Sequence, residues 1–141
     1  MVRDAEAVYA LSIKQPWAAL VVAGLKTIEI RRWPTARRGR ILIHAARVPD
    51  ARDVAWQYVT PQVQALAELR GGIIGAVELT DCRTYKDLAS FVADQTAHRN
   101  EPAWFEPPQL YGFVFTSPQV VPFKTYPGWF RFFPVKGWEA T

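Results

Sequence analysis

Three charged side chains of different chemistry lie within six residues of one another: Lys26, Glu29 and Arg31. Lysine is a compact cation that can hold one phosphate or carbonyl oxygen, and burial lowers its pKa so that it can act as a base or nucleophile. Glu29 and Arg31 belong to the alternating segment 27–31, which predicts a strand with both side chains on one face, about 7 Å apart. There the carboxylate can orient the guanidinium, accept a hydrogen bond from a base amino group, or act as a general base.

The same residues also have purely structural interpretations. A lysine just after a helix is favoured by the helix dipole, and a Glu–Arg pair on a strand can be a plain ion pair. Without further signals these interpretations are the simpler ones.

Arginine dominates the charge of residues 24–47, which hold seven Lys and Arg side chains against the one acidic residue Glu29. Arg37, Arg38 and Arg40 surround Gly39 in a predicted turn, from which planar guanidinium groups can spread along a phosphate backbone. Most charged runs are only solvated surface. Because six of these seven cations are arginine, we favour phosphate binding.

Aromatic residues accompany the cations. Trp33, which comes directly after the alternating strand, is a candidate for stacking on an unpaired base. The segment 123–129 combines aromatic side chains with Lys124 and is a candidate for the far wall of a cleft, or for the filling of a small barrel. Trp17 has the helical spacing of a core residue.

The elements that must position these side chains can be read from periodicity and from proline and glycine. A helix opens at Pro16 and ends at Gly24, with Trp17, Leu20, Val21 and Leu25 on its apolar face. Further helices are expected over 50–69, where Pro61 opens a second helix after Thr60, and over 85–97. The expected strands are 10–13, 27–31, 41–46, 73–79, 111–116, 119–123 and 129–133. This irregular interleaving predicts an α+β fold in which helices pack on a mostly antiparallel, barrel-like sheet.

Length and composition narrow the class of protein. The chain has 141 residues, half of them hydrophobic, which predicts one packed domain rather than a disordered chain. No membrane span or signal peptide is expected, and the single cysteine, Cys82, agrees with a cytoplasmic location and excludes a cysteine-rich zinc site. Neither His44 nor His98 has a metal-ligating partner at suitable spacing, so no metal is expected.

The segment Gly24-Leu25-Lys26-Thr27-Ile28-Glu29-Ile30-Arg31 matches G-x-K-x-x-E-x-R. This pattern resembles the signature of the activating signal cointegrator homology (ASCH) domain family. The flanking Gln15-Pro16-Trp17 and Arg38-Gly39-Arg40 are similar to the coactivator-type subgroup of that family. The resemblance is dense over 10–47 and looser over 71–135.

The resemblance implies a PUA-like fold, a small β-barrel flanked by helices, with nucleic acid bound in a cleft beside the motif strand. Some bacterial relatives act instead as amidohydrolases on acylated cytidine, and others as ribonucleases. In the amidohydrolase-like relatives a catalytic threonine stands three residues after the motif lysine, where this chain has Glu29. That mechanism is therefore not carried over to this sequence.

We therefore expect a single ASCH-like domain over residues 1–141, with its core from about 10 to 135, that binds RNA or single-stranded DNA without a cofactor. The alternatives are a small hydrolase or ribonuclease that uses Lys26 and Glu29, and a protein-interaction module in a transcription or translation assembly. The expected nucleic-acid-binding residues are Lys26, Glu29, Arg31, Trp33, Arg37, Arg38, Arg40 and Lys124.

Overall fold

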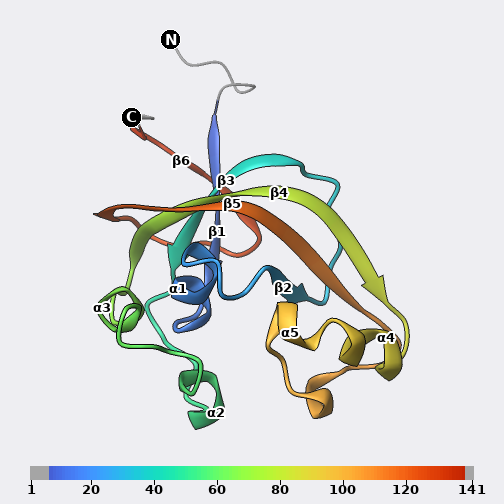
Figure 1. The fold of residues 1–141 in the computed structure, drawn as a ribbon. Helices are drawn as coiled ribbons and strands as arrows, with labels where there is room; N and C mark the ends of the chain where they lie inside the picture. The colour runs from blue at the N-terminus through green and yellow to red at the C-terminus, as the bar shows by residue number, and fades with distance from the viewer. Residues whose placement is uncertain (1–6, 139–141) are drawn as a thin grey trace.

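The computed structural model describes residues 7–138. Its six strands form one curled sheet in the order β2-β5-β4-β3-β1-β6. Two long, curved strands cross the middle of this sheet and arch over the rest of the chain (Figure 1). The strands are β1 (Val8–Ile13), β2 (Ile28–Arg31), β3 (Gly39–Ala45), β4 (Gly72–Tyr85), β5 (Leu110–Thr125) and β6 (Phe132–Val135).

The sheet is mostly antiparallel. Four of its five strand pairs run antiparallel, and only β1 and β3 run parallel. With its helices it forms an α+β half-barrel, which confirms the predicted fold class. Because β2 and β6 are the two edges of the sheet order, the curl stays open between them.

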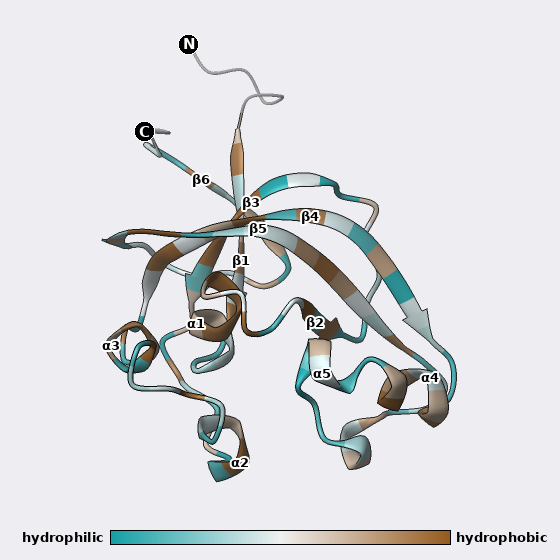
Figure 2. Ribbon diagram, in the orientation of Figure 1, coloured by the Kyte–Doolittle hydropathy of each residue, from teal (hydrophilic) through white to brown (hydrophobic). Residues whose placement is uncertain are grey.

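The helix α1 (Trp17–Val22) confirms the helix predicted after Pro16. It ends where Gly24 takes a positive φ of 80°, a conformation that glycine adopts without strain. All six residues of the helix are buried under the sheet, and Figure 2 shows the helix as hydrophobic beneath the arch. Leu25 is the exception to the predicted apolar face, because it lies beyond the helix and is exposed.

The helices predicted over 50–69 and 85–97 are shorter in the structure than expected. Within 50–69 the chain forms only α2 (Asp53–Trp56) and α3 (Gln64–Ala67), and Pro61 lies in a turn before α3. Within 85–97 Tyr85 still belongs to β4, and the helical part divides into α4 (Leu88–Ala93) and α5 (Gln95–His98). Tertiary packing explains Tyr85, which is buried against Phe91 and Leu110 and so extends the strand.

The strands at the C-terminal end also differ from the prediction. Residues 111–116 and 119–123 are parts of the single strand β5. Pro118 is tolerated because β2 pairs with β5 only at 111–114, so that the missing N–H of this proline leaves no bond to β2 unmade. The last strand begins at Phe132, which leaves Trp129 and Phe130 in a loop before it. The loop between Glu101 and Gln109 contains the short 3-10 helix η2 (Pro102–Trp104).

The core lies between α1 and the concave side of the sheet. Its buried residues come from β1, α1, β3, β4 and β5, and include Leu11, Leu20, Ile43, Ile74 and Phe113. None of the helices in residues 7–138 has both the length and the hydropathy required to traverse a lipid bilayer.

Candidate functional site

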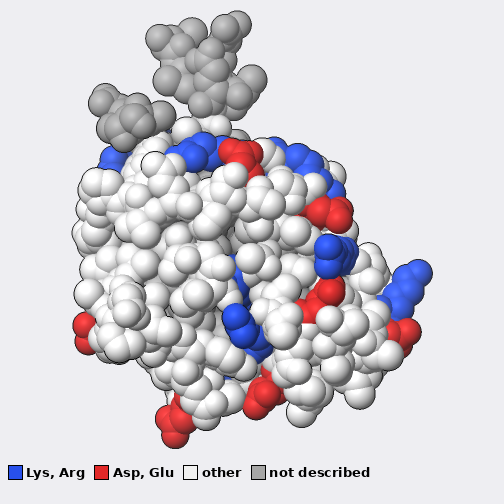
Figure 3. All heavy atoms as spheres, viewed as in Figure 1, with Lys and Arg blue, Asp and Glu red and all other residues white. Residues whose placement is uncertain are grey.

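A cleft of about 570 Å³ opens beside β2 and the start of α1. Its walls come from five parts of the chain: the end of β1 with α1, the strand β2 with its flanking residues, the segment 46–52, Asn100 after α5, and the loop before β6. Five Lys and Arg side chains and two carboxylates line it: Lys14, Lys26, Arg31, Arg52, Arg131, Glu29 and Asp50. In Figure 3 a small group of Lys and Arg side chains emerges near the middle of the face, apart from those along its upper edge.

Lys26 lies at the floor of the cleft and is almost completely buried. Its Nζ donates to the carbonyl oxygen of His98 and lies 3.6 Å from Glu29 Oε1. The indole ring of Trp17 is 5.3 Å from the same nitrogen. Burial lowers the pKa of Lys26 to about 8, although the nearby Glu29 carboxylate opposes this shift.

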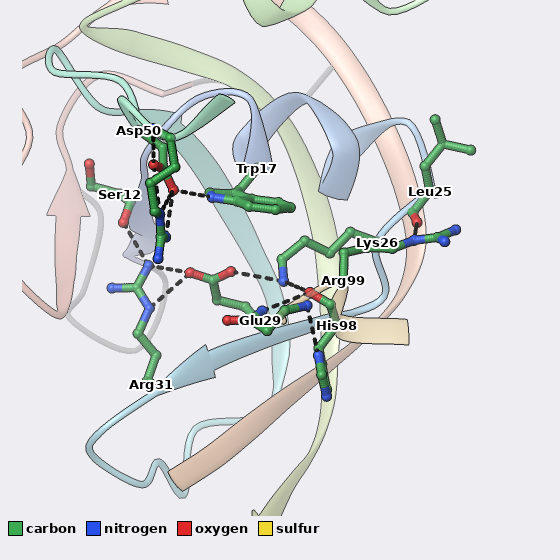
Figure 4. Close-up of polar contacts among 11 residues, drawn as sticks. Ser12, Trp17, Leu25, Lys26, Glu29, Arg31, Asp50, His98 and Arg99 are labelled. Carbon is green, nitrogen blue, oxygen red and sulfur yellow. Dashed lines mark hydrogen bonds and ion pairs between the residues drawn. The ribbon is translucent and has the colours of Figure 1, made fainter. Parts of the chain in front are cut away.

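Glu29 lies between two cations, as Figure 4 shows. Arg31 donates to Glu29 Oε2 through Nε at 3.1 Å and Nη2 at 2.8 Å. Nη2 of Arg31 also donates to the Ser12 carbonyl oxygen at 3.0 Å, which ties β2 to β1 across the cleft. Among residues 7–138, Nη1 is the guanidinium nitrogen of Arg31 that keeps its hydrogens free for a ligand. The alternation of 28–31 places Ile28 and Ile30 on the opposite, apolar side of the strand.

A second polar group borders the cleft around Asp50. The Trp17 indole N–H donates to Asp50 Oδ2 at 2.8 Å, and Arg52 donates to the same carboxylate through Nη2 at 2.7 Å. Burial alone would raise the pKa of Asp50, but the hydrogen bonds from Arg52 and Trp17 hold it at about 2. The Arg52 guanidinium stacks 3.6 Å from the centre of the Trp104 ring, which leaves it at the edge of the cleft.

Aromatic rings form much of the remaining wall. Trp33 lines the cleft but is half-buried, with its ring edge-on to Phe113 at 5.0 Å and the Arg131 guanidinium 5.0 Å from its centre. Trp129 and Phe130 also line the cleft, and both are exposed. Trp17 combines the core position expected for it with a place at the cleft.

The three arginines of the predicted turn were expected to bind nucleic acid together with the residues of strand 27–31, but none of them lines this cleft. Arg37 stacks on Tyr9 at 4.1 Å, and Arg40 donates to Gln119 Oε1 at 3.1 Å. Arg38 donates to the Thr35 and Arg37 carbonyl oxygens. The pairing of β1 with β3 explains the separation. The cleft-lining end of β1 (Ser12 and Ile13) pairs with His44 and Ala45 at the end of β3, whereas the predicted turn lies at the start of that strand. That these arginines bind nucleic acid stays a prediction.

Lys124 is also remote from the cleft lining. It lies on β5, where its Nζ donates to the Gly137 carbonyl oxygen at 3.0 Å. The structure therefore brings Lys26, Glu29, Arg31 and Trp33 together, and leaves Arg37, Arg38, Arg40 and Lys124 outside.

Several cleft residues were missed from the sequence. Lys14, Asp50, Arg52, Asn100 and Arg131 carried no motif, and they reach the cleft from segments far apart along the chain. The one usable signal was the aromatic segment 123–129, whose last residue, Trp129, does lie on the cleft wall.

The described part of the chain contains no group of three or more His, Cys, Asp or Glu side chains that could hold a metal ion. The two histidines are used in hydrogen bonds instead. His98 Nε2 bonds to the Phe91 carbonyl oxygen, and His44 Nε2 bonds to that of Tyr126.

Comparison with known families gives one match over nearly the whole chain: the model described as "ASCH domain" matches residues 11–135. Among curated proteins, human activating signal cointegrator 1 is 29% identical over 137 residues, which cover 92% of this chain and 21% of that protein. The mouse protein of the same name is 28% identical over the same lengths. The chain thus spans about a fifth of the curated relatives it matches.

Solved structures show the same fold at lower identity. The crystal structure of an ASCH protein from Zymomonas mobilis superposes with a TM-score of 0.62 at 17% identity, covering 93% of this chain and 89% of that one. A point mutant of the same protein superposes with a TM-score of 0.63 at 16% identity, covering 93% of this chain and 91% of that one. At these identities the likeness concerns the fold alone.

Proposed function

The chain belongs to the ASCH domain family, and we propose that it binds single-stranded nucleic acid, with one nucleotide held in the cleft beside β2. The observation that carries this proposal is the composition of the cleft. The buried Lys26 and Glu29 and the partly exposed Arg31 form its floor, tryptophan rings form its walls, and further cations lie at its edge.

The size of the cleft supports a ligand of nucleotide dimensions. Its volume of about 570 Å³ falls in the range of small-molecule sites, which measure roughly 300–1,000 Å³. Aromatic walls with a few convergent polar groups are also typical of such sites. An unpaired base can enter a cleft of this kind, whereas a base inside a duplex cannot reach a buried floor.

Each charged group has a role in this arrangement. Glu29 accepts a hydrogen bond from a base amino group, and its two cationic neighbours offset the repulsion between its carboxylate and a phosphate. Nη1 of Arg31 donates to a base carbonyl or to phosphate. Lys14, Arg52 and Arg131 contact the phosphates on either side of the bound nucleotide.

The test is a binding titration of fluorescent single-stranded RNA and DNA at several salt concentrations. The affinity is expected to fall with salt with a log–log slope of about −0.7 for each phosphate contacted. The variant Lys14→Ala/Arg131→Ala is expected to bind more weakly and to lose about 0.7 of slope for each cation removed. Lys86→Ala, which removes an exposed cation away from the cleft lining, is the control. Absence of binding at low salt would refute the proposal.

A second candidate function, hydrolysis of a modified nucleoside amide or of RNA, is favoured by the lowered pKa of Lys26. With a pKa of about 8, a fraction of Lys26 is a neutral amine near pH 7 and can act as a base or nucleophile, with Glu29 3.6 Å away. We place this function second because the Lys26 Nζ is already engaged by the His98 carbonyl and by Glu29.

Incubation with acylated cytidine and with labelled RNA decides between the two functions. Turnover by the parent protein that is lost in a folded Lys26→Ala variant would make hydrolysis the first candidate. Binding without turnover of either substrate would leave nucleic-acid binding as the function.

A further inference from the structure

We infer that the loop between β5 and β6, residues 126–131, is a stacking arm that holds a second nucleobase next to the nucleotide in the cleft. The inference rests on the proposed function and adds to it that the ligand is a strand of at least two nucleotides. The loop begins after the last residue of β5, Thr125, and ends before the first residue of β6, Phe132. Its two aromatic rings, Trp129 and Phe130, both line the cleft and are the reason for the inference.

Trp129 and Phe130 are the most exposed large apolar side chains among the described residues, at 66% and 72% of their full surface. Their rings stack on each other, with centres 5.5 Å apart and planes 28° apart. Two large apolar rings held side by side in water are unusual, and such exposed groups mark binding sites. Because both rings also line the cleft, a ligand in the cleft passes directly beside them.

The base of the arm is firmly attached to the sheet. The carbonyl oxygen of Tyr126 accepts a hydrogen bond from His44 Nε2 at 2.7 Å, and the Tyr126 N–H donates to the Gly71 carbonyl oxygen at 3.1 Å. Gly128 lies directly against the His44 ring, where an added Cβ would come within 2.7 Å of Cε1. Rings on an anchored loop lose little conformational freedom when a ligand binds, so stacking on them yields more net affinity.

The far end of the arm brings charge to the same place. Arg131 follows the two rings, and its guanidinium lies 5.0 Å from the centre of the Trp33 ring inside the cleft. Lys14 and Arg52 line the cleft as well. A partner that stacks on two rings and meets three cations must combine flat apolar faces with negative charge. Single-stranded nucleic acid has this combination at every residue of its chain.

The experiment compares a short strand with a single nucleotide. Parent protein and a Trp129→Ala/Phe130→Ala variant are titrated with the four nucleoside 5′-monophosphates and with hexamers of uridylate and thymidylate. Stacking contributes about 1–3 kcal/mol per base, so the variant is expected to bind the hexamers about 5- to 150-fold more weakly. Its affinity for the monophosphates is expected to fall by a clearly smaller factor, because Lys26, Glu29 and Arg31 on the cleft floor remain in place.

Two further variants control the experiment. Trp129→Phe keeps a ring in place and is expected to retain most of the hexamer affinity. Phe123→Ala removes a partly exposed ring of β5 that does not line the cleft, and is expected to bind both ligands as the parent does. Because the arm rings are exposed, their removal leaves the core intact, which the unfolding midpoint checks.

Each contrary result has a separate meaning. If the double variant binds hexamers as tightly as the parent, the stacking arm is refuted and the cleft proposal stands. If hexamers and monophosphates are lost equally, the loop only shapes the cleft, which also refutes a second base site. If the parent binds neither ligand, the proposed function and the arm both fail. Capture of a protein through Trp129 and Phe130, with unchanged hexamer binding, overturns the arm as well.

Discussion

Lys26 Nζ lies 3.6 Å from Glu29 Oε1, and both side chains are nearly removed from solvent at the floor of the cleft. The pair is three residues apart in the chain, and the turn from α1 into β2 brings the charges together. Burial of a lysine disfavours its charged form, whereas the carboxylate favours it. The balance of these two effects can be measured, as can their consequences for the cleft.

Lys26 is expected to titrate near pH 8, well below an ordinary lysine. Since the unfolded chain keeps its proton up to about pH 10.5, folding releases a proton between these values and stability rises with pH across this window. The midpoint is measured by NMR of the labelled lysine Cε, with the exposed Lys136 as control. A Lys26→Met variant is expected to lack the corresponding rise in the free energy of unfolding, and a Lys26 midpoint above pH 10 would contradict the prediction.

Glu29→Gln is expected to lower the pKa of Lys26 further. The carboxylate is the main group that opposes the effect of burial, and its removal leaves Lys26 and Arg31 as two cations without their shared partner. The same change is expected to cost about 3 kcal/mol of stability, because the remaining charges are largely buried. Urea unfolding and the Lys26 titration measure the two effects. If the pH midpoint of the Lys26 titration is the same in Glu29→Gln as in the parent, the Lys26 and Glu29 side chains are not coupled.

Asp50 is expected to contribute to stability only above acidic pH. Its folded pKa of about 2 lies below the ordinary value of 3.8, so its contribution is complete above that value and is lost as pH falls towards 2. Asp50→Asn is expected to lose about 1–2 kcal/mol at pH 7, since the half-exposed Arg52 weakens the pair. At pH 2 the variant and the parent are expected to have nearly the same free energy of unfolding. If Asp50→Asn loses the same amount of stability at pH 7 and at pH 2, hydrogen bonding rather than the charge of Asp50 stabilises the site.

Two double variants with the same change in charge locate the phosphate path. Arg38→Ala/Arg40→Ala removes the two cations that flank Gly39 at the predicted turn, where β3 begins, and Lys14→Ala/Arg131→Ala removes cations of the cleft edge. Both are expected to weaken single-strand binding uniformly across sequences. Only the cleft-edge variant is expected to weaken binding of a nucleoside monophosphate. If the turn variant binds hexamers as the parent does, the arginine turn is surface and the strand does not extend to it.

Much of the fold could be predicted from local patterns. The alternation of 28–31 determines that Glu29 and Arg31 share one face while Ile28 and Ile30 pack on the other, because side chains of a strand alternate. Pro16 and Gly24 likewise mark the two ends of α1. The lengths of the helices after residue 50 could not be predicted, since neighbours distant in sequence decide whether Tyr85 extends a strand or starts a helix.

The sequence by itself determined the family, the face of β2 that carries Glu29 and Arg31, and the nearness of both to Lys26. All of these are properties of a short segment, since they depend on residues a few positions apart. Only the tertiary structure decided what surrounds that face. In the sheet, the start of β3 lies at the end away from the cleft, so Arg38 and Arg40 lie elsewhere, while Arg52 and Arg131 come to the cleft from other parts of the chain. Sheet order depends on contacts between distant segments, and no local period in the chain encodes it.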